Sequence, residues 1–202
     1  MIHLIGAGGH GQVVLDALLE GGTELSDVTA RADSACPDLQ GLPVQVPSIT
    51  DSLAGHSFHV AIGLADVREA LHAKAEQAGG SALTVIHPAA AVSRFATIGA
   101  GSFVAAGAVV APTAKVGRGV IVNHGAIIDH DCVVGDFTHI APNAILGGGV
   151  TVGARCLIGA GAVIKPGRQI GDDVTIGGGA VVTRDVPSGQ TWFGVPAGPK
   201  AS

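Results

Sequence analysis

An aliphatic side chain recurs at every sixth position from residue 86 to residue 182, without insertion or gap. The register consists of Ile86, Val92, Ile98, Val104, Val110, Val116, Val122, Ile128, Val134, Ile140, Leu146, Val152, Ile158, Ile164, Ile170, Ile176 and Val182. An amphipathic helix would repeat roughly every 3.6 residues and a half-exposed strand every second residue, so neither explains this spacing. Tandem hexapeptides are typical of a parallel β-helix, in which each short strand stacks on the strand one coil earlier.

The positions between these aliphatic residues predict the corners of such a column. Glycine stands three positions after the aliphatic residue in eight hexads, and Asp131, Asn143, Asp173 and Asp185 stand there in others. These residue types tolerate the positive φ that a sharp corner requires. Three hexads would therefore close a triangular coil of eighteen residues. The whole array predicts a prism on the order of 27 Å long, at about 4.8 Å per coil.

Residues 1–85 lack the sixfold pattern and predict a small Rossmann-like α/β domain. We expect strands at Ile2–Ile5, 27–30, 59–64 and 81–85. One amphipathic helix should end at Gly21 and Gly22, and a capping box at Asp66 and Glu69 should begin a second helix that reaches about residue 77. The predicted organisation is thus an α/β domain over residues 1–85, a β-helix over 86–186 and a C-terminal tail over 187–202.

Composition and charge narrow the class of protein. Hydrophobic residues make up 47% of the chain and charged residues 13%, which predicts extensive burial and excludes a disordered chain. The net charge of −5 offers no basic face, so neither nucleic acid nor an anionic membrane is expected as a partner. No signal peptide and no apolar run of about twenty residues are seen, so we expect a cytoplasmic protein.

The three cysteines do not form a disulfide framework. Cys132 and Cys156 both take the inward position of their hexads, but they are four hexads apart. Because only residues separated by a multiple of eighteen stack on one face, these two thiols should lie on different faces and serve as small buried hydrophobes. We therefore do not expect Cys132 to be a catalytic nucleophile, although it lies two residues from His130.

A glycine-rich turn follows the first predicted strand. Gly6-Ala7-Gly8-Gly9-His10-Gly11 matches the pattern G-x-G-x-x-G and precedes the first helix, with Asp33 about twenty residues later. Glycines in such a turn let backbone N–H groups approach a phosphate at the helix N-terminus. The domain has room for only one mononucleotide-binding half, which favours a mononucleotide or a nucleotide-linked sugar over a dinucleotide. A tight turn without a ligand is the alternative.

One region of the hexad array is polar, whereas the neighbouring hexads contain mostly small and apolar residues. It contains Asn123 and His124, then Asp129-His130-Asp131, and later His139. His124 and His130 occupy equivalent corner positions of successive hexads, and the two flanking carboxylates would raise the basicity of His130. His130 is therefore the candidate general base. For His124, an exposed corner histidine without a function is the favoured interpretation.

With these motifs, the chain resembles the hexapeptide-repeat acyltransferases that fold as left-handed β-helices. The resemblance rests on Gly-x-Gly-Gly-His-Gly near the N-terminus, Ile-Ile-Asp-His-Asp-Cys and Phe-Thr-His in the array, and Phe-Gly-Val-Pro-Ala near the C-terminus. It is specific to the branch that contains sialic acid O-acetyltransferases and the N-acetyltransferases of nucleotide-linked 4-amino sugars, as in the bacillosamine and perosamine pathways. Left-handedness is implied by the resemblance alone.

The resemblance also implies roles for individual residues. His130 would be the general base, Asp131 would orient it, and His139 would hydrogen-bond the acetyl group of acetyl-CoA. Substrate-binding positions would be Gly8, His10, Gly11, Asp33, Ile62, Gly63 and Asn123. The pantetheine arm of acetyl-CoA would lie against Gly148, Ala160 and Gly178, in a groove between two subunits of a homotrimer.

The resemblance therefore implies direct transfer of acetyl from acetyl-CoA to the amine of a nucleotide-linked amino sugar, without a metal or an acyl-enzyme. O-acetylation of a sialic acid-type hydroxyl and non-catalytic binding of a sugar nucleotide are alternatives. A metal-dependent hydratase resembling γ-class carbonic anhydrases would need stacked histidines, and no two of His124, His130 and His139 are a multiple of eighteen apart. An NAD oxidoreductase is disfavoured because the second nucleotide-binding half is missing.

Overall fold

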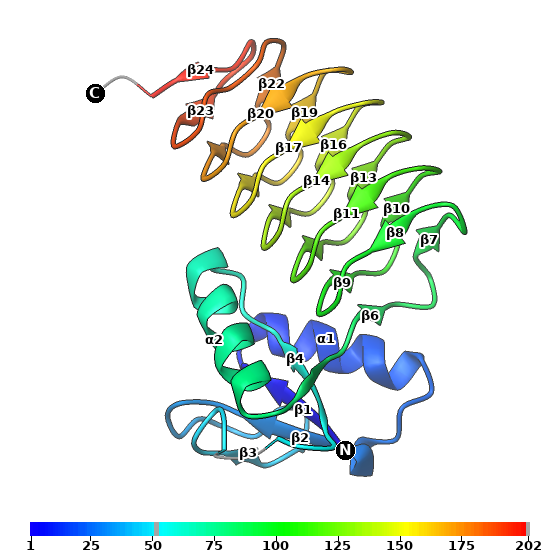
Figure 1. Cartoon of the computed structure of the whole chain (residues 1–202), viewed down its shortest axis with the longest axis vertical. Coiled ribbons are helices and arrows are strands. Elements are labelled where there is room, and N and C mark those ends of the chain that lie inside the picture. Colours follow the sequence, from blue (N-terminus) through cyan, green and yellow to red (C-terminus); the bar gives the residue numbers. More distant parts are fainter. Residues whose placement is uncertain (51–52, 201–202) are drawn as a thin grey trace.

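The computed structural model has two parts, a small α/β domain and a column of short strands that rises from it (Figure 1). It describes residues 1–50 and 53–200. No helix within these ranges is long and apolar enough to cross a membrane.

The α/β domain is built on a five-stranded parallel sheet with the order β3-β2-β1-β4-β5. Its strands are β1 (Ile2–Ile5), β2 (Val28–Arg31), β3 (Val44–Gln45), β4 (Ser57–Val60) and β5 (Ser81–Ala82). Successive side chains of a strand point to opposite faces of the sheet. Leu4 packs in the hydrophobic cluster that contains residues of α1 (Gly9–Glu20), and Ile5 packs in the cluster that contains residues of α2 (Ala65–Gln77). The two helices thus cover opposite faces, and the predicted Rossmann-like domain is confirmed.

Three local expectations for this domain were wrong. The strand expected at 59–64 ends at Val60, because the carbonyls of Ile62 and Gly63 bond to the Arg68 side chain instead of a neighbouring strand. The capping box is absent, since α2 starts at Ala65 with Leu64 as its N-cap and no side-chain capping bond. The segment 81–85 divides between two sheets, with β5 in the α/β domain and β6 (Val85–Ile86) in the column.

The column is a left-handed parallel β-helix with three flat faces. The first face contains β6, β9 (Phe103–Val104), β12 (Ile121–Val122), β15 (His139–Ile140), β18 (Leu157–Ile158), β21 (Thr175–Ile176), β23 (Thr191–Phe193) and β24 (Gly198–Pro199). The second face contains β7 (Ala91–Val92), β10 (Val109–Val110), β13 (Ile127–Ile128), β16 (Ile145–Leu146), β19 (Val163–Ile164) and β22 (Val181–Val182). The third face contains β8 (Thr97–Ile98), β11 (Lys115–Val116), β14 (Val133–Val134), β17 (Thr151–Val152) and β20 (Gln169–Ile170).

The register confirms the eighteen-residue coil, since Val109 pairs with Ile127 and Val110 with Ile128. From β9 to β22, the second residue of each strand is buried inside the column, and Ile128, Ile140 and Ile158 are fully buried there. At the first coil, Ile86, the second residue of β6, is 41% exposed. Cys132 and Cys156 are buried and free, as predicted. At its C-terminal end, β23 continues the first face by pairing with β21, and β24 returns antiparallel to β23.

The corners follow the glycine pattern with some exceptions. Asp131, Asn143 and Asp173 adopt the predicted positive φ. Asp185 does not, and it lies where the chain leaves the repeat and Val186 forms an isolated bridge to Ile170. Positive φ also occurs at three corners that have no glycine, asparagine or aspartate at this position, namely Thr113, Phe137 and Arg155.

Candidate functional site

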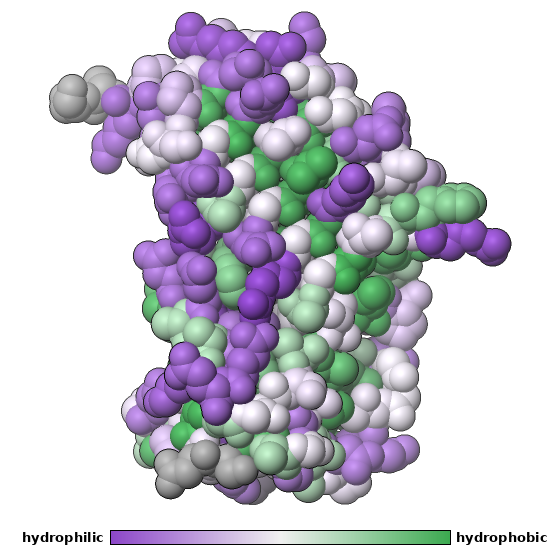
Figure 2. Space-filling view, in the orientation of Figure 1, coloured by the Kyte–Doolittle hydropathy of each residue, from purple (hydrophilic) through white to green (hydrophobic). Residues whose placement is uncertain are grey.

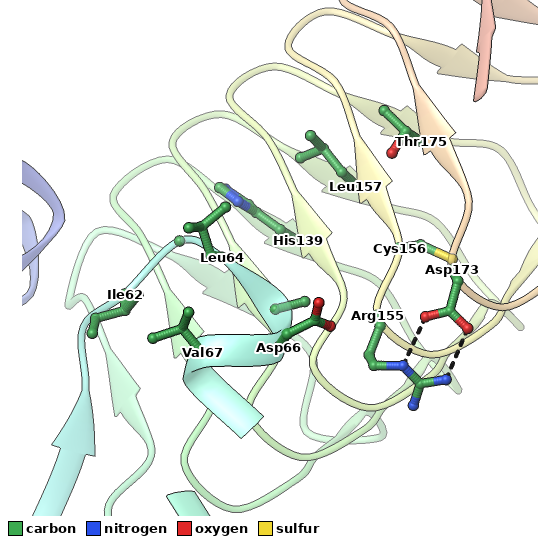
Figure 3. A pocket seen from close by; sticks show the side chains of 12 residues that line it. Ile62, Leu64, Asp66, Val67, His139, Arg155, Cys156, Leu157, Asp173 and Thr175 are labelled. Carbon is green, nitrogen blue, oxygen red and sulfur yellow. Dashed lines mark hydrogen bonds and ion pairs between the residues drawn. The ribbon is translucent and has the colours of Figure 1, made fainter. Parts of the chain in front are cut away.

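A cavity of about 720 Å³ lies where the α/β domain meets the first face of the column (Figure 3). One wall is the segment 62–67, which links β4 to the first turn of α2. The opposite wall is formed by outward residues of successive strands, His139, Leu157 and Thr175, which stack in register. Arg155 and Asp173, joined by paired hydrogen bonds of 2.8 and 2.9 Å, lie at the corner between the third and first faces.

His139 is the histidine that lines this cavity. Its Nε2 lies 3.1 Å from the side-chain nitrogen of Asn123, which follows β12 on the preceding coil. Burial, and then the charge of Arg68, lower the pKa of His139 to about 4. The ring is therefore neutral at neutral pH and has one N–H donor and one bare nitrogen.

The glycine turn brings His10 to the same place. The His10 ring lies 5.4 Å from the ring of Phe103 and 6.5 Å from that of His139. Its Nε2 is buried without a hydrogen-bond partner among the described residues. Burial first, and then the nearby His59 and His139, lower the pKa of His10 to about 3, so this ring is also neutral.

The turn itself leaves space for a ligand. A Cβ atom at Gly11 would lie 2.2 Å from the Gly6 carbonyl oxygen, so the close approach of helix and strand requires glycine there. In contrast, a Cβ at Gly8 or Gly9 would meet nothing within 4 Å. Gly8 is the N-cap of α1 and provides no side-chain cap, so no side chain of the N-cap residue satisfies the first N–H groups of the helix.

Asp33 is placed differently from this group. It lies in the segment after β2, and its Oδ1 accepts hydrogen bonds from the hydroxyl and the backbone N–H of Ser48. The neighbouring Arg31 is buried and donates to His3, Gln45 and the Pro47 carbonyl. The structure thus joins Asp33 to the loop around residue 48, while His10, Ile62 and Gly63 lie at or near the cavity.

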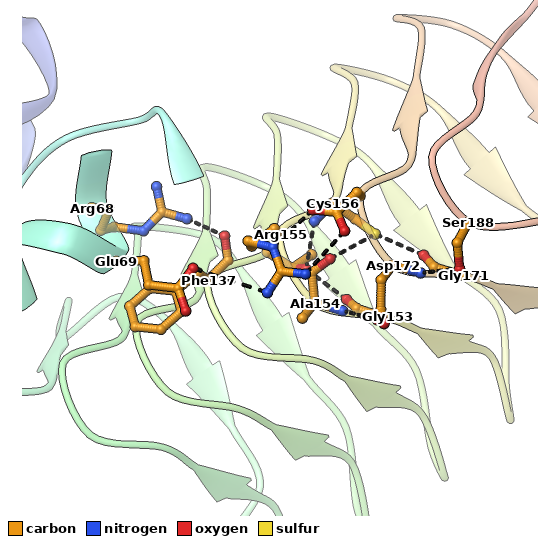
Figure 4. Close-up of polar contacts among 12 residues, drawn as sticks. Arg68, Glu69, Phe137, Gly153, Ala154, Arg155, Cys156, Gly171, Asp172 and Ser188 are labelled. Atoms are coloured by element: carbon orange, nitrogen blue, oxygen red, sulfur yellow. Dashed lines mark hydrogen bonds and ion pairs between the residues drawn. The ribbon is translucent and has the colours of Figure 1, made fainter. Parts of the chain in front are cut away.

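Arg68, which nothing in the sequence singled out, holds the cavity wall in place. Its side chain is 1% exposed and donates to four backbone carbonyls. Two of these belong to Ile62 and Gly63, both at 2.8 Å, and two to corners of the column at Gly119 and Phe137. Figure 4 shows the bond to the Phe137 carbonyl. Burial lowers its pKa only to about 10, so Arg68 remains a cation at neutral pH.

His130 and Asp131 form a pair on a different edge of the column, between the second and third faces. Nδ1 of His130 lies 2.8 Å from Oδ2 of Asp131, and the Thr113 hydroxyl donates to the other carboxylate oxygen at 2.7 Å. The bond to Asp131, and then the charge of Asp129, raise the pKa of His130. The other ring nitrogen, Nε2, lies over Gly148, where a Cβ atom would approach it to 2.6 Å.

The predicted site residues on the column therefore fall into two groups within one chain. His130, Asp131 and Gly148 lie on the edge between the second and third faces, and the cavity lining does not include them. Asn123, Ala160 and Gly178 lie on the edge between the first and second faces, where Asn123 contacts His139. A Cβ at Gly178 would lie 3.2 Å from the Ala160 carbonyl oxygen, which shows that these two positions stack directly.

The second face of the column lies between these two edges and is apolar on its outside. Its outward residues are Ala91, Val109, Ile127, Ile145, Val163 and Val181. Figure 2 shows hydrophobic side chains gathered in a band along the column. Each of these six residues is at least partly exposed in the single chain. Among the described residues, no cluster of three or more His, Cys, Asp and Glu side chains could hold a metal ion.

Comparison with known proteins identifies two matching family models. The PglD N-terminal domain matches residues 1–75, and the bacterial transferase hexapeptide (six repeats) matches residues 131–166 and 149–184. No curated protein matches the chain.

Among solved structures, the acetyltransferase domain of PglB from Neisseria gonorrhoeae FA1090 is 36% identical over 98% of each chain, with a TM-score of 0.92. A mutant of perosamine N-acetyltransferase from Caulobacter crescentus, in complex with CoA and GDP-perosamine, is 37% identical over 100% of this chain and 97% of its own, with a TM-score of 0.92. WeeI from Acinetobacter baumannii AYE is 30% identical over 99% of each chain, with a TM-score of 0.90.

Proposed function

Because the chain belongs to the family of hexapeptide-repeat sugar N-acetyltransferases, we propose that it transfers the acetyl group of acetyl-CoA to the amine of a nucleotide-linked amino sugar. Residues 1–85 would bind the nucleotide and residues 86–186 would bind the acyl donor. The observation that carries the proposal is the His130–Asp131 pair, in which Nε2 of His130 lies above a glycine and has no hydrogen-bond partner among the described residues. The complex of the Caulobacter crescentus relative with CoA and GDP-perosamine supports the substrate class.

The proposal includes a homotrimer, because one chain separates the general base from the cavity. If three columns surround a common axis with their second faces inward, each edge carrying His130 meets a neighbour's edge carrying Asn123. The apolar residues of the second face would then be covered. Each site would combine His130, Asp131 and Gly148 of one chain with Asn123, His139, Ala160 and Gly178 of the next.

The nucleotide would bind at the start of α1. The uncapped helix N-terminus and the free space at Gly8 and Gly9 suit a diphosphate, since a helix N-terminus carries a partial positive charge. The sugar would then extend past His10 and the segment containing Ile62 and Gly63 into the cavity beside His139.

The chemistry needs a neutral amine and a stabilised oxyanion. Nε2 of His130 removes a proton from the amine as its nitrogen attacks the thioester carbonyl, while Asp131 holds Nδ1 and stabilises the imidazolium. Charge that develops on the carbonyl oxygen is stabilised by the N–H of His139. The C–S bond then breaks, and the departing thiolate of coenzyme A takes the proton from His130. Cys132 takes no part, since it is buried, donates to the Gly147 carbonyl, and burial raises the pKa of its thiol.

The direct test is an assay of coenzyme A release with acetyl-CoA and a panel of acceptors. The panel contains 4-amino sugars linked to UDP, GDP and dTDP, together with free sialic acid. We expect turnover with at least one nucleotide-linked amine and an N-acetylated product by mass spectrometry. Turnover only with sialic acid would instead establish O-acetylation, and binding of a sugar nucleotide without any turnover would indicate a non-catalytic binding protein.

A further inference from the structure

The side chain of Asn123 is held at both ends. Its Oδ1 accepts the backbone N–H of His124 at 2.9 Å, and its Nδ2 lies 3.1 Å from Nε2 of His139. A backbone N–H can only donate, so the amide atom facing it must be the oxygen. The hydrogen-bond network therefore fixes the orientation of this amide, which would otherwise be ambiguous.

This orientation determines where His139 carries its proton. An amide NH₂ group can only donate, so Nε2 of His139 must accept. The ring is neutral because burial and Arg68 lower its pKa to about 4, and a neutral imidazole with a bare Nε2 carries its proton on Nδ1. Nδ1 has no hydrogen-bond partner among the described residues, and the ring lines the cavity (Figure 3).

The other groups around the ring do not compete for Nε2. Arg68 uses its donors on backbone carbonyls, and His10 lies 6.5 Å away between ring centres. The charged residues that line the cavity are Asp66, Arg155 and Asp173, and the last two are paired with each other. Among the described residues, the His139 ring therefore has one hydrogen-bond partner, the side chain of Asn123.

We infer that Asn123 is a positioning residue that holds His139 in its Nδ1–H tautomer, so that Nδ1 donates to the carbonyl oxygen of the acyl thioester. The tautomer follows from the contacts of the chain itself, whereas the use of the donor rests on the proposed function. No proton is transferred in this step, because the N–H only stabilises the oxygen while it is negatively charged.

Two substitutions at the same position separate this role from simple packing. Asn123→Asp has the same shape, and one carboxylate oxygen can still accept from His124. The other carboxylate oxygen can only accept a hydrogen bond from His139, so it favours a proton on Nε2 of His139 and leaves Nδ1 bare. Asn123→Ala removes the constraint and lets both tautomers form. We expect kcat to fall by about 100-fold in Asn123→Asp and by about 10-fold in Asn123→Ala, because the loss of one oxyanion donor costs about 10²–10³ in rate.

The tautomer is measured independently of activity by nitrogen NMR of histidine-labelled protein, at a pH where the ring is neutral. We expect a protonated Nδ1 in the unsubstituted chain and a protonated Nε2 in Asn123→Asp. A protonated Nε2 in the unsubstituted chain, or an Asn123→Ala loss as large as that of Asn123→Asp, would overturn the inference.

A double substitution excludes a purely electrostatic effect of the new carboxylate. In a His139→Ala background, Asn123→Asp and Asn123→Ala should have equal rates, since no ring is left to orient. A persistent difference would mean that the carboxylate acts on the oxyanion directly, and the inference would be wrong. If the unsubstituted chain acetylates no amine at all, the proposed function fails, while the NMR experiment still decides the tautomer.

Discussion

The two histidine-containing regions of this molecule place the same side chain in opposite environments. At the edge between the second and third faces, the His130 ring is 60% exposed and bonded to a carboxylate, which raises its pKa. In the cavity, His139 and His10 are largely enclosed near the cation Arg68, and their pKa values are lowered to about 4 and about 3. One environment favours a proton acceptor that can hold a charge, and the other favours neutral hydrogen-bonding groups. Environments that push pKa values apart are a physical basis for assigning acid–base roles.

The largest expected effect is the loss of the proposed base. His130→Ala should lower kcat by a factor of about 10²–10⁴, because general base catalysis contributes that much. Acetyl-CoA and acceptor binding should survive, since the side chain is 60% exposed and its side-chain hydrogen bond among the described residues is the one to Asp131. The measurement is steady-state kinetics together with a thermal melt that reports an intact fold. Near-normal turnover in a folded variant would show that His130 is not the general base. The difference between its environment and that of His139 would then not correspond to different catalytic roles.

The next largest effect concerns the cavity and the arginine beside it, Arg68. Arg68→Met leaves four backbone carbonyls without their donor, and hydrogen bonds to charged groups are worth about 1.5–3 kcal/mol each before relaxation. We expect the free energy of unfolding to fall by about 3 kcal/mol, measured by urea denaturation. KM for the sugar nucleotide should rise, because the segment containing Ile62 and Gly63 loses its attachment to the column.

Arg118 offers a matched control for this substitution. It also joins α2 to the column, through a bond of 2.6 Å to Glu76, but its side chain is 38% exposed. Arg118→Met should therefore change stability by at most about 1 kcal/mol, as for other exposed ion pairs. If the free energy of unfolding fell equally in Arg68→Met and Arg118→Met, burial would not explain the contribution of Arg68 to stability.

These residues also show what the sequence can reveal. The column was predictable because each coil must repeat the inward aliphatic position of the coil before it, and the pairing of Val109 with Ile127 follows directly. The pair His130 and Asp131 was visible because its members are adjacent in the chain. In both cases, the signal is local or periodic.

The remaining features depend on contacts between distant segments. Arg68 reaches carbonyls 51 and 69 residues further along the chain, and nothing in its own helix distinguishes it from a solvated arginine. The positive φ of Arg155 accompanies a bidentate bond to Asp173 on the next coil, so no single hexad predicts it. The early end of β4 has the same origin, because Arg68 binds the carbonyls that a longer strand would have used.

The smallest expected effect tests what sets the basicity of His130. Asp131→Asn keeps the shape of the side chain but replaces the carboxylate, whose hydrogen bond contributes most to the raised pKa of His130, by a neutral acceptor. As the proposed base, His130 works only when deprotonated, so activity should fall as the pH drops below its pKa, and a lower pKa should move that decline to lower pH. We expect this shift in the pH profile of kcat/KM, with a loss of about 10-fold in the plateau rate because the imidazolium is less stabilised. Thr113→Val is the matched control, since it removes only the hydroxyl that donates to Asp131 and should leave the decline nearly in place. An unchanged profile in Asp131→Asn would assign the raised pKa to Asp129, the other carboxylate beside the ring.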